Sequence, residues 1–306
     1  MPTESIPRWL AVLTVLAIAT AFGANHVAAR LAFDHGANVV TAIVFRSAGT
    51  AAAVLLLMLL QGVRLHVSRP TFGRAIVIGV ILSVQSYCLY SSVARIPVAL
   101  ALLAFNTYPL LLALISWLAG GERPSRRALL VMPIALAGLA LALDVGGWSH
   151  GRSGFGGRWD EIGVGVGFAL GAGASFAAAL FLTTRWLGPV DGRMRSFLTM
   201  TTVAVLAGAA GAATGGFALP VDGIGWLGLV LLTVFYGLAF TSAFVVLPRM
   251  GAVNNVALMN FEPIAVLLMG WVILGQTVAP LQLAGALIVI GAIVALALAR
   301  QPPRGP

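Results

Sequence analysis

A chain of 306 residues has room for one or two soluble domains, but its composition excludes that class. Apolar residues make up 60% of the chain and charged residues 9%, whereas soluble domains hold about 45–50% and about 25%. The mean hydropathy of +1.01 agrees with this, because a soluble fold of such composition would lack the polar side chains to cover its surface. The sequence therefore predicts an integral membrane protein.

The net charge of +9 comes from eighteen arginines and no lysine, set against nine acidic residues. Most arginines lie between apolar runs and form no basic stripe, so the charge indicates membrane topology and excludes a nucleic-acid partner. The single cysteine, Cys88, cannot form an intrachain disulfide, and the four histidines show no metal-ligand spacing. We therefore expect no cofactor and no metal ion.

Ten apolar runs are long enough to cross the roughly 30 Å hydrocarbon core of a bilayer, which takes about 20 helical residues. They cover residues 9–31, 38–60, 73–94, 97–119, 126–144, 162–185, 194–214, 223–248, 252–274 and 280–299. Residues 145–161 contain Gly, Ser and Arg and are predicted to be a flexible linker. The first run is too long and too weakly charged at its start for a signal peptide, so we expect it to remain as a span.

The arginines are shared unequally between the two sides of this arrangement. With the N-terminus inside, thirteen lie on one side, four lie on the other, and Arg46 lies within a span. Because cytoplasmic loops carry the excess of basic residues, we expect both termini in the cytoplasm.

The two halves of the chain repeat each other at a constant spacing. Arg95, Asn106, Pro109 and Trp117 recur 154 positions later as Arg249, Asn260, Pro263 and Trp271. Each half holds five spans, an odd number, so the second half enters the membrane upside down relative to the first. The predicted fold is an all-α integral membrane protein of ten transmembrane helices, in two inverted five-helix repeats (1–144 and 162–306) around a central cavity.

Several stretches resemble the drug/metabolite transporter superfamily, EamA type. Residues 87–125 look like the third and fourth helices of that family, and residues 247–296 look like its eighth to tenth helices. The segments FGANHVAAR (22–30) and VFRSAGTAAAVLLL (44–57) also fit its pattern. The family often has Gly-Glu after the fourth and ninth helices; Gly121-Glu122 keeps this motif, whereas Gly275-Gln276 does not.

The resemblance implies a ten-helix basket that exports metabolites, amino acids or drugs, and the chain is most similar to the branch exporting aromatic and other hydrophobic amino acids. We therefore expect a secondary transporter of the bacterial inner membrane that exports small hydrophobic metabolites, such as these amino acids, by alternating access. Export of lipophilic cations or drugs is the second hypothesis. A membrane sensor or intramembrane enzyme is the third, but the chain shows no nucleophile–base set and no output domain, so we expect no enzyme. Proton coupling and facilitated diffusion both stay open, as does the oligomeric state.

Two charged side chains lie inside predicted spans. Glu262 is about ten residues into the ninth run, or ~15 Å deep, where a carboxyl group must face a cavity or a polar partner. It either contacts a substrate ammonium group or carries a coupling proton, or it fixes helix packing beside Pro263. Arg46 either meets a substrate carboxylate or an intramembrane acid, or it extends toward the outer interface; the structural role is favoured.

Asn106 and Asn260 precede Pro109 and Pro263 by three residues. Each proline removes a backbone donor and frees a carbonyl one turn earlier, which a nearby amide can satisfy. We predict structural roles for the asparagines, with Asn260 also a cavity candidate, and gating hinges at the prolines.

The remaining cavity candidates are polar or aromatic side chains within the spans: His26, Gln85, Tyr87, Tyr108, Phe176 and Tyr236. Aromatic walls suit a planar hydrophobic substrate. Tyr90 is discounted because tyrosines at the ends of spans usually belong to the interfacial belt. For each of these residues, ordinary helix packing is the favoured alternative.

Overall fold

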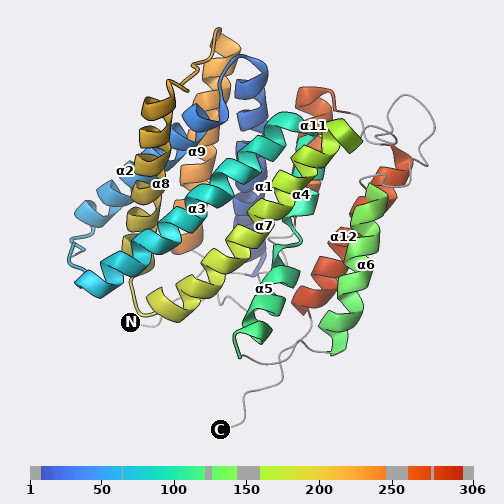
Figure 1. Cartoon of the computed structure of the whole chain (residues 1–306), viewed down its shortest axis with the longest axis horizontal. Coiled ribbons are helices and arrows are strands. Elements are labelled where there is room, and N and C mark those ends of the chain that lie inside the picture. Colours follow the sequence, from blue (N-terminus) through green and yellow to red (C-terminus); the bar gives the residue numbers. More distant parts are fainter. Residues whose placement is uncertain are drawn as a thin grey trace.

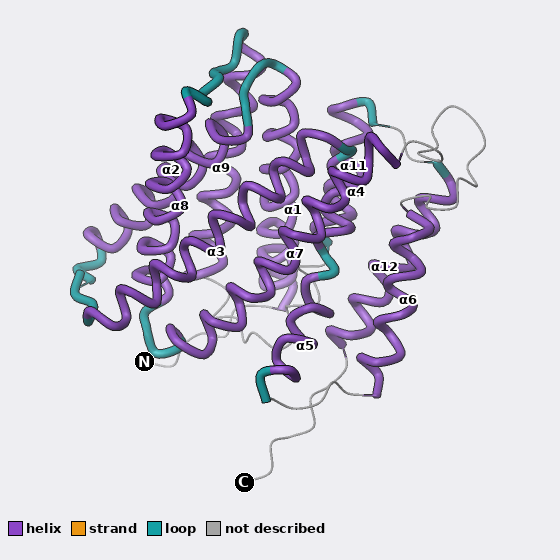
Figure 2. Tube along the Cα trace, viewed as in Figure 1, coloured by secondary structure: helices purple, strands orange, loops and turns teal. Residues whose placement is uncertain are grey.

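The computed structural model describes residues 8–63, 65–120, 126–142, 159–245, 261–276 and 279–298. Every regular element within these ranges is a helix (Figure 2). The helices are α1 (Arg8–Asp34), α2 (Val39–Leu60), α3 (Arg69–Arg95), α4 (Val98–Phe105), α5 (Tyr108–Leu118), α6 (Arg126–Ala142), α7 (Trp159–Leu187), α8 (Gly192–Thr214), α9 (Gly223–Val245), α11 (Glu262–Leu274) and α12 (Pro280–Leu298). Most of the predicted linker, residues 145–158, lies outside the described residues.

Within the described ranges, seven segments are long and apolar enough to span a membrane, and three shorter apolar helices accompany them. The seven segments are Val12–Asp34, Val39–Leu60, Arg69–Arg95, Val98–Leu118, Ile162–Leu187, Gly192–Thr214 and Gly223–Ser242. Each of these segments and shorter helices coincides with one predicted run. The chain is therefore a multi-pass membrane protein.

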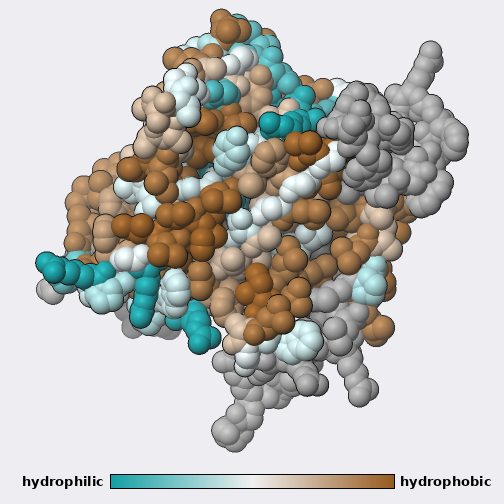
Figure 3. All heavy atoms as spheres, viewed as in Figure 1, coloured by the Kyte–Doolittle hydropathy of each residue, from teal (hydrophilic) through white to brown (hydrophobic). Residues whose placement is uncertain are grey.

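The outer faces of the helices are apolar. Leu60, Leu118 and Val272 are each more than 70% exposed, and apolar side chains cover wide areas of the face shown in Figure 3. Soluble monomers rarely expose such surface, whereas lipid tails accept it.

The fourth predicted span, residues 97–119, is two helices instead of one. Pro109 has no N–H to donate to the carbonyl of Phe105, so the helix stops at Phe105 and α5 starts at Tyr108. The Asn106 Nδ2 atom donates to the Leu102 carbonyl at 2.8 Å, and the Thr107 hydroxyl donates to the Ala104 carbonyl at 2.8 Å. The predicted structural role of Asn106 therefore takes a definite form, because its side chain binds the last turn of α4.

The helices pack in pairs that follow the repeat. If each helix is replaced by its equivalent in the other half, every main pair becomes another main pair or itself. In Figure 1, α3 and α7 lie side by side and run in opposite directions; α9 packs on α1 in the corresponding way. Helix α2 packs on α8, and α6 packs on α12, so each of these helices meets its own counterpart. An approximate two-fold relation therefore links the packing partners of the two halves.

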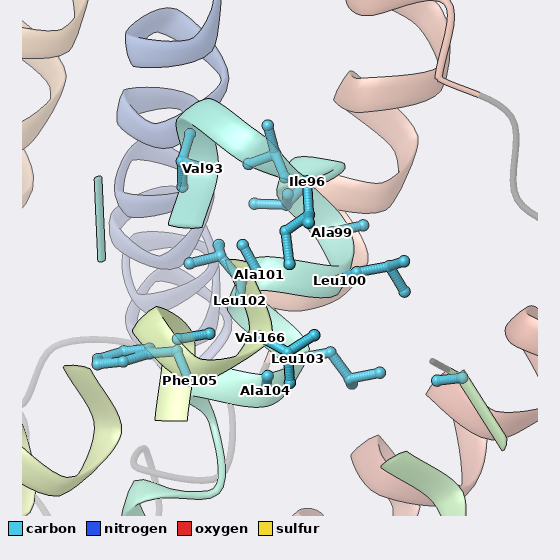
Figure 4. Close-up of a cluster of buried hydrophobic side chains, with 14 of the residues drawn as sticks. Val93, Ile96, Ala99, Leu100, Ala101, Leu102, Leu103, Ala104, Phe105 and Val166 are labelled. Carbon is cyan, nitrogen blue, oxygen red and sulfur yellow. The ribbon is translucent and has the colours of Figure 1, made fainter. Parts of the chain in front are cut away.

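The end of α3, all of α4 and part of α7 form a closed apolar core. Every residue of α4 is buried, as expected for a helix that is apolar on all sides. Figure 4 shows Ile96, Leu102 and Leu103 of this core packed near Val166 of α7. The core ends at Phe105, which also borders the cavity described below.

Two connections from different halves of the chain bind each other at one end of the bundle. The His35 Nδ1 atom lies 2.6 Å from the Asp222 carboxylate, and the Val221 N–H donates to the His35 carbonyl at 3.0 Å. Hydrogen bonds from the Gly225 N–H and from His35 lower the pKa of Asp222. The ionised Asp222 carboxylate therefore stabilises the folded protein above its ordinary pKa. This contribution to folding stability is lost as the pH falls through the lowered pKa.

Candidate functional site

A cavity of about 350 Å³ lies between the helices of the two halves. This volume falls within the range of small-molecule sites, about 300–1,000 Å³. The residues that line it are Phe22, His26, Arg46, Leu82, Gln85, Ser86, Leu89, Phe105, Asn106, Tyr108, Phe176, Ala179, Leu180, Thr183, Arg195, Ser196, Thr199, Met200, Tyr236, Phe240 and Glu262. They come from α1, α2, α3, α4, α5, α7, α8, α9 and α11 and from the break between α4 and α5.

Six of the eight predicted cavity residues line this one space: His26, Gln85, Tyr108, Phe176, Tyr236 and Glu262. Asn260 lies outside the described residues. Tyr87 does not line the cavity: its side chain is 47% exposed, and its ring packs 6.2 Å from the ring of Phe168. The expectation for Tyr87 is corrected, because residues two apart on a helix point in nearly opposite directions and Gln85 already faces inward.

One face of α3 supplies four lining residues at helical spacing: Leu82, Gln85, Ser86 and Leu89. The spacing i, i+3, i+4, i+7 is that of a single helix face. Sequence reasoning found Gln85 and missed the other three. The signal that identifies them is that they lie on the same helix face as Gln85.

Twelve lining residues form six pairs at the repeat spacing of 154, as in 176 − 22 and 236 − 82. The pairs are Phe22 with Phe176, His26 with Leu180, Arg46 with Met200, Leu82 with Tyr236, Ser86 with Phe240, and Tyr108 with Glu262. Equivalent positions of the two repeats therefore meet around one space. In five of the pairs the two side chains differ in type. The largest difference is at the position that holds Arg46 in the first repeat and Met200 in the second.

Arg46 lies deep in this cavity wall and does not extend to an interface. Its side chain is only 3% exposed, and its Nη2 atom donates to the Ser86 hydroxyl at 2.7 Å. The guanidinium carbon lies 4.0 Å from the ring centre of Tyr236 and 5.0 Å from that of Tyr90. The expected extension toward the outer interface is therefore wrong.

Tyr90 belongs to the same network, although its sequence position suggested an interfacial residue. It is fully buried, and its hydroxyl donates to the Asn25 Oδ1 atom at 2.7 Å. Together with Tyr236 it holds the guanidinium of Arg46 between two aromatic rings.

The surroundings of Arg46 offset only part of the cost of burying its charge. Cation–π contacts contribute about 0.5–2 kcal/mol each, whereas desolvation costs several kcal/mol per ion. Within the described ranges no carboxylate forms an ion pair with Arg46, and its Nε–H has no hydrogen-bond partner. The cavity wall thus holds a positive charge that no described carboxylate neutralises.

Glu262 is the first residue of α11 and also borders the cavity. Its Oε1 atom lies 3.7 Å from the Nε2 atom of His26, and the two side chains are 19% and 6% exposed. The Nδ1 atom of His26 has no partner within the described chain. An acidic and a basic side chain from different repeats therefore meet at the cavity wall.

Aromatic rings form two clusters in the wall. Tyr108 packs edge-to-face on Phe176 at 4.9 Å, and Phe105 lies 5.4 Å from both rings. In the second cluster, Tyr236 stacks on Phe240 of the same helix at 5.4 Å and meets Phe22 of α1 edge-to-face at 5.9 Å. These rings give the cavity flat apolar surfaces on both sides.

The two predicted hinge prolines do not line the cavity. Pro109 is the second residue of α5, and Pro263 is the second residue of α11. Pro263 is buried beside a small void between α4, α11 and α12. Within the described residues, no group of three or more potential metal ligands is present.

A family model described as the EamA-like transporter family matches residues 9–143 and 163–298, which is most of the chain. The chain belongs to the EamA-like transporter family. A curated relative, an uncharacterized transporter of Synechocystis sp., is 27% identical over 143 residues, and the alignment covers 46% of this chain but only 41% of that protein. A crystal structure covers 95% of this chain and 97% of its own, with a TM-score of 0.61 and 21% identity, which shows likeness of fold alone.

In this EamA-like transporter the cavity extends further toward one end of the bundle than toward the other. Thr183, Arg195 and Ser196 line it near the end of α7 and the start of α8. Their repeat equivalents Ala29, Thr41 and Ala42 are buried at 0–1% exposure and do not line this cavity. Equivalent positions of the two repeats therefore differ, since one set borders the cavity and the other is packed in the protein interior.

The change of the second Gly-Glu motif to Gly275-Gln276 keeps a hydrogen-bond acceptor. The Gln276 Oε1 atom accepts the Val98 N–H at 3.1 Å, which satisfies a free donor at the start of α4. A neutral amide serves this purpose as a carboxylate would, so the function of this contact needs no charge.

Proposed function

We propose that this protein is a secondary transporter of the bacterial inner membrane that exports small hydrophobic metabolites, foremost aromatic and other hydrophobic amino acids. The observation that carries the proposal is the cavity between the two halves, which combines two aromatic clusters with one buried cation and one carboxyl group. An amino acid with an aromatic side chain presents the complementary groups.

We further propose ten transmembrane helices in two inverted repeats, with both termini in the cytoplasm. The packing partners that exchange between the halves support the inversion. The excess of arginines on one side supports the orientation. The proposal includes Asn260 as a cavity residue and residues 145–161 as the linker between the repeats.

Alternating access is supported by the unequal ends of the cavity. Two halves built to one plan can exchange their conformations, and the cavity then extends toward the opposite end of the bundle. In the present state it extends toward Thr183 and Arg195, on the side of the α8 start. The arginine asymmetry favours a cytoplasmic position for this side, and we infer from it an inward-facing state.

The test is uptake into proteoliposomes that contain the full-length protein. The panel is phenylalanine, tryptophan and leucine, a lipophilic cation (tetraphenylphosphonium) and glucose, each with and without a pH gradient. The proposal predicts saturable uptake of the amino acids above that of protein-free liposomes. Uptake of the cation in place of the amino acids would favour the drug-export hypothesis, and uptake of none would contradict the proposal.

A further inference from the structure

We propose that Arg46 is the binding site for the carboxylate of the transported molecule, so that the cavity selects hydrophobic carboxylic acids over the corresponding amines. This inference rests on the transport function proposed above and names the chemical class that the cavity accepts. It replaces the structural role that the sequence favoured for Arg46.

The geometry of the guanidinium leaves it ready for an anion. Ser86 accepts one of its N–H groups at 2.7 Å, and the rings of Tyr90 and Tyr236 face its carbon at 5.0 Å and 4.0 Å. These contacts fix the planar group in one orientation. Within the described part of the chain the Nε–H has no partner, and this atom is itself covered by protein. Arg46 is only 3% exposed but lines the cavity, so a carboxylate would meet the part of the guanidinium that borders this space.

The described acidic residues do not compensate this charge. Glu262, which lines the same cavity, contacts His26. The other acidic side chains that form ion pairs in the described part of the chain, Asp34, Asp191 and Asp222, lie at the ends of helices. A planar guanidinium binds a carboxylate through charge-assisted hydrogen bonds better than it binds any other common metabolite group except phosphate. The aromatic walls exclude a phosphorylated sugar, which has little apolar surface to bury.

The second repeat has no counterpart of the Arg46 site. The position equivalent to Arg46 in the second repeat is Met200, which lines the same cavity and carries no charge. The position equivalent to Ser86, which fixes Arg46, is the aromatic Phe240. The two repeats therefore differ in charge at this position, and we infer that the carboxylate binds at Arg46, beside α2 and α3.

The experiment compares three probes of similar shape in proteoliposomes: phenylalanine, phenethylamine, which lacks the carboxylate, and 3-phenylpropionate, which lacks the ammonium group. Competition of each probe against uptake of labelled phenylalanine gives its half-inhibitory concentration. For the wild-type protein we expect phenethylamine to compete about 10- to 100-fold less well than phenylalanine, the loss expected for one charge-assisted contact.

Arg46→Gln should remove this preference, so that phenylalanine and phenethylamine compete equally. Arg46→Lys should keep part of it, since it retains the charge and loses the planar fork. The matched control is Arg195→Gln, which removes another arginine from the same cavity and should change the competition of all three probes to a similar degree. Because each preference is a ratio within one variant, a lower yield of folded protein does not alter it.

Equal competition by phenethylamine and phenylalanine in the wild type would overturn the inference while leaving transport intact, and so would an unchanged preference in Arg46→Gln. If Arg46→Gln does not fold, the wild-type ratio and that of Arg46→Lys decide the matter. A failure of the proposed function has a different signature, because the wild type would then take up no labelled phenylalanine at all.

Discussion

Glu262 begins α11 and faces His26 of α1 across 3.7 Å at the cavity wall. A carboxyl group in this place can bind a substrate ammonium group or release and take up a proton during transport. Both roles require a group that titrates, whereas a packing role requires only its shape.

Glu262→Gln keeps the shape and removes the titration. We expect its rate of phenylalanine uptake to fall roughly tenfold at neutral pH, the effect of losing one charge-assisted contact, and to lose the pH dependence of the wild type. Uptake measured from pH 5 to pH 9 checks this, with Glu262→Asp as the control that keeps a carboxyl group. A wild-type rate for Glu262→Gln at every pH would assign Glu262 to packing.

Residue positions in the cavity could be predicted only where chemistry distinguishes them. His26 and Glu262 were identifiable as cavity residues because the membrane makes the burial of polar and charged side chains costly. Arg46 stood out for the same reason but was predicted to have a structural role, because a long side chain can also extend to an interface. Tyr87 and Tyr90 were not separable, because both faces of α3 are largely apolar and lipid resembles the protein interior. The structure places Tyr87 at 47% exposure and Tyr90 at none.

At the scale of elements, close contact between helices depends on glycine. A Cβ atom at Gly285 of α12 would lie 2.6 Å from the carbonyl oxygen of Gly138 in α6, which is closer than real Cβ contacts. Helices in membranes gain their stability from such close packing, because lipid provides no hydrophobic drive for their association.

Gly285→Ala should therefore destabilise the α6–α12 pair. Overpacking costs about 1–3 kcal/mol, while alanine returns about 1 kcal/mol of helix propensity, so the net loss is about 0–2 kcal/mol. We expect the upper end here, because the Cβ would meet backbone atoms that cannot rotate away. Gly291→Ala is the matched control on the same helix, because a Cβ there meets no atom within 4 Å. Thermal unfolding in detergent should show a lower Tm for Gly285→Ala alone; an unchanged Tm would contradict the close approach.

The bounds of the helices were predictable from hydropathy, but the break in the fourth span, between α4 and α5, was not predicted. Predicted runs such as 38–60 and 194–214 agree closely with α2 and α8. Pro109 was recognised as a helix disturbance, yet a proline can kink a helix or end it. Hydrogen bonds from Asn106 and Thr107 to α4 carbonyls favour the ending, and these depend on side-chain conformations.

At the scale of the molecule, the spacing of 154 found in four residue types extends to six pairs around the cavity. A repeat in sequence could predict that equivalent helices meet. It could not predict that the cavity extends further toward one end of the bundle, because that inequality is a property of the conformation and not of the repeat.

The central claim is that this cavity carries a hydrophobic amino acid across the membrane by alternating access. Counterflow in proteoliposomes tests it most directly. Vesicles are loaded with unlabelled phenylalanine and diluted into a trace of labelled phenylalanine, and the label inside is followed over time. A carrier that exchanges its two states predicts a transient accumulation of label above equilibrium that is absent from vesicles loaded with glucose. Equal label in both sets of vesicles would contradict the account.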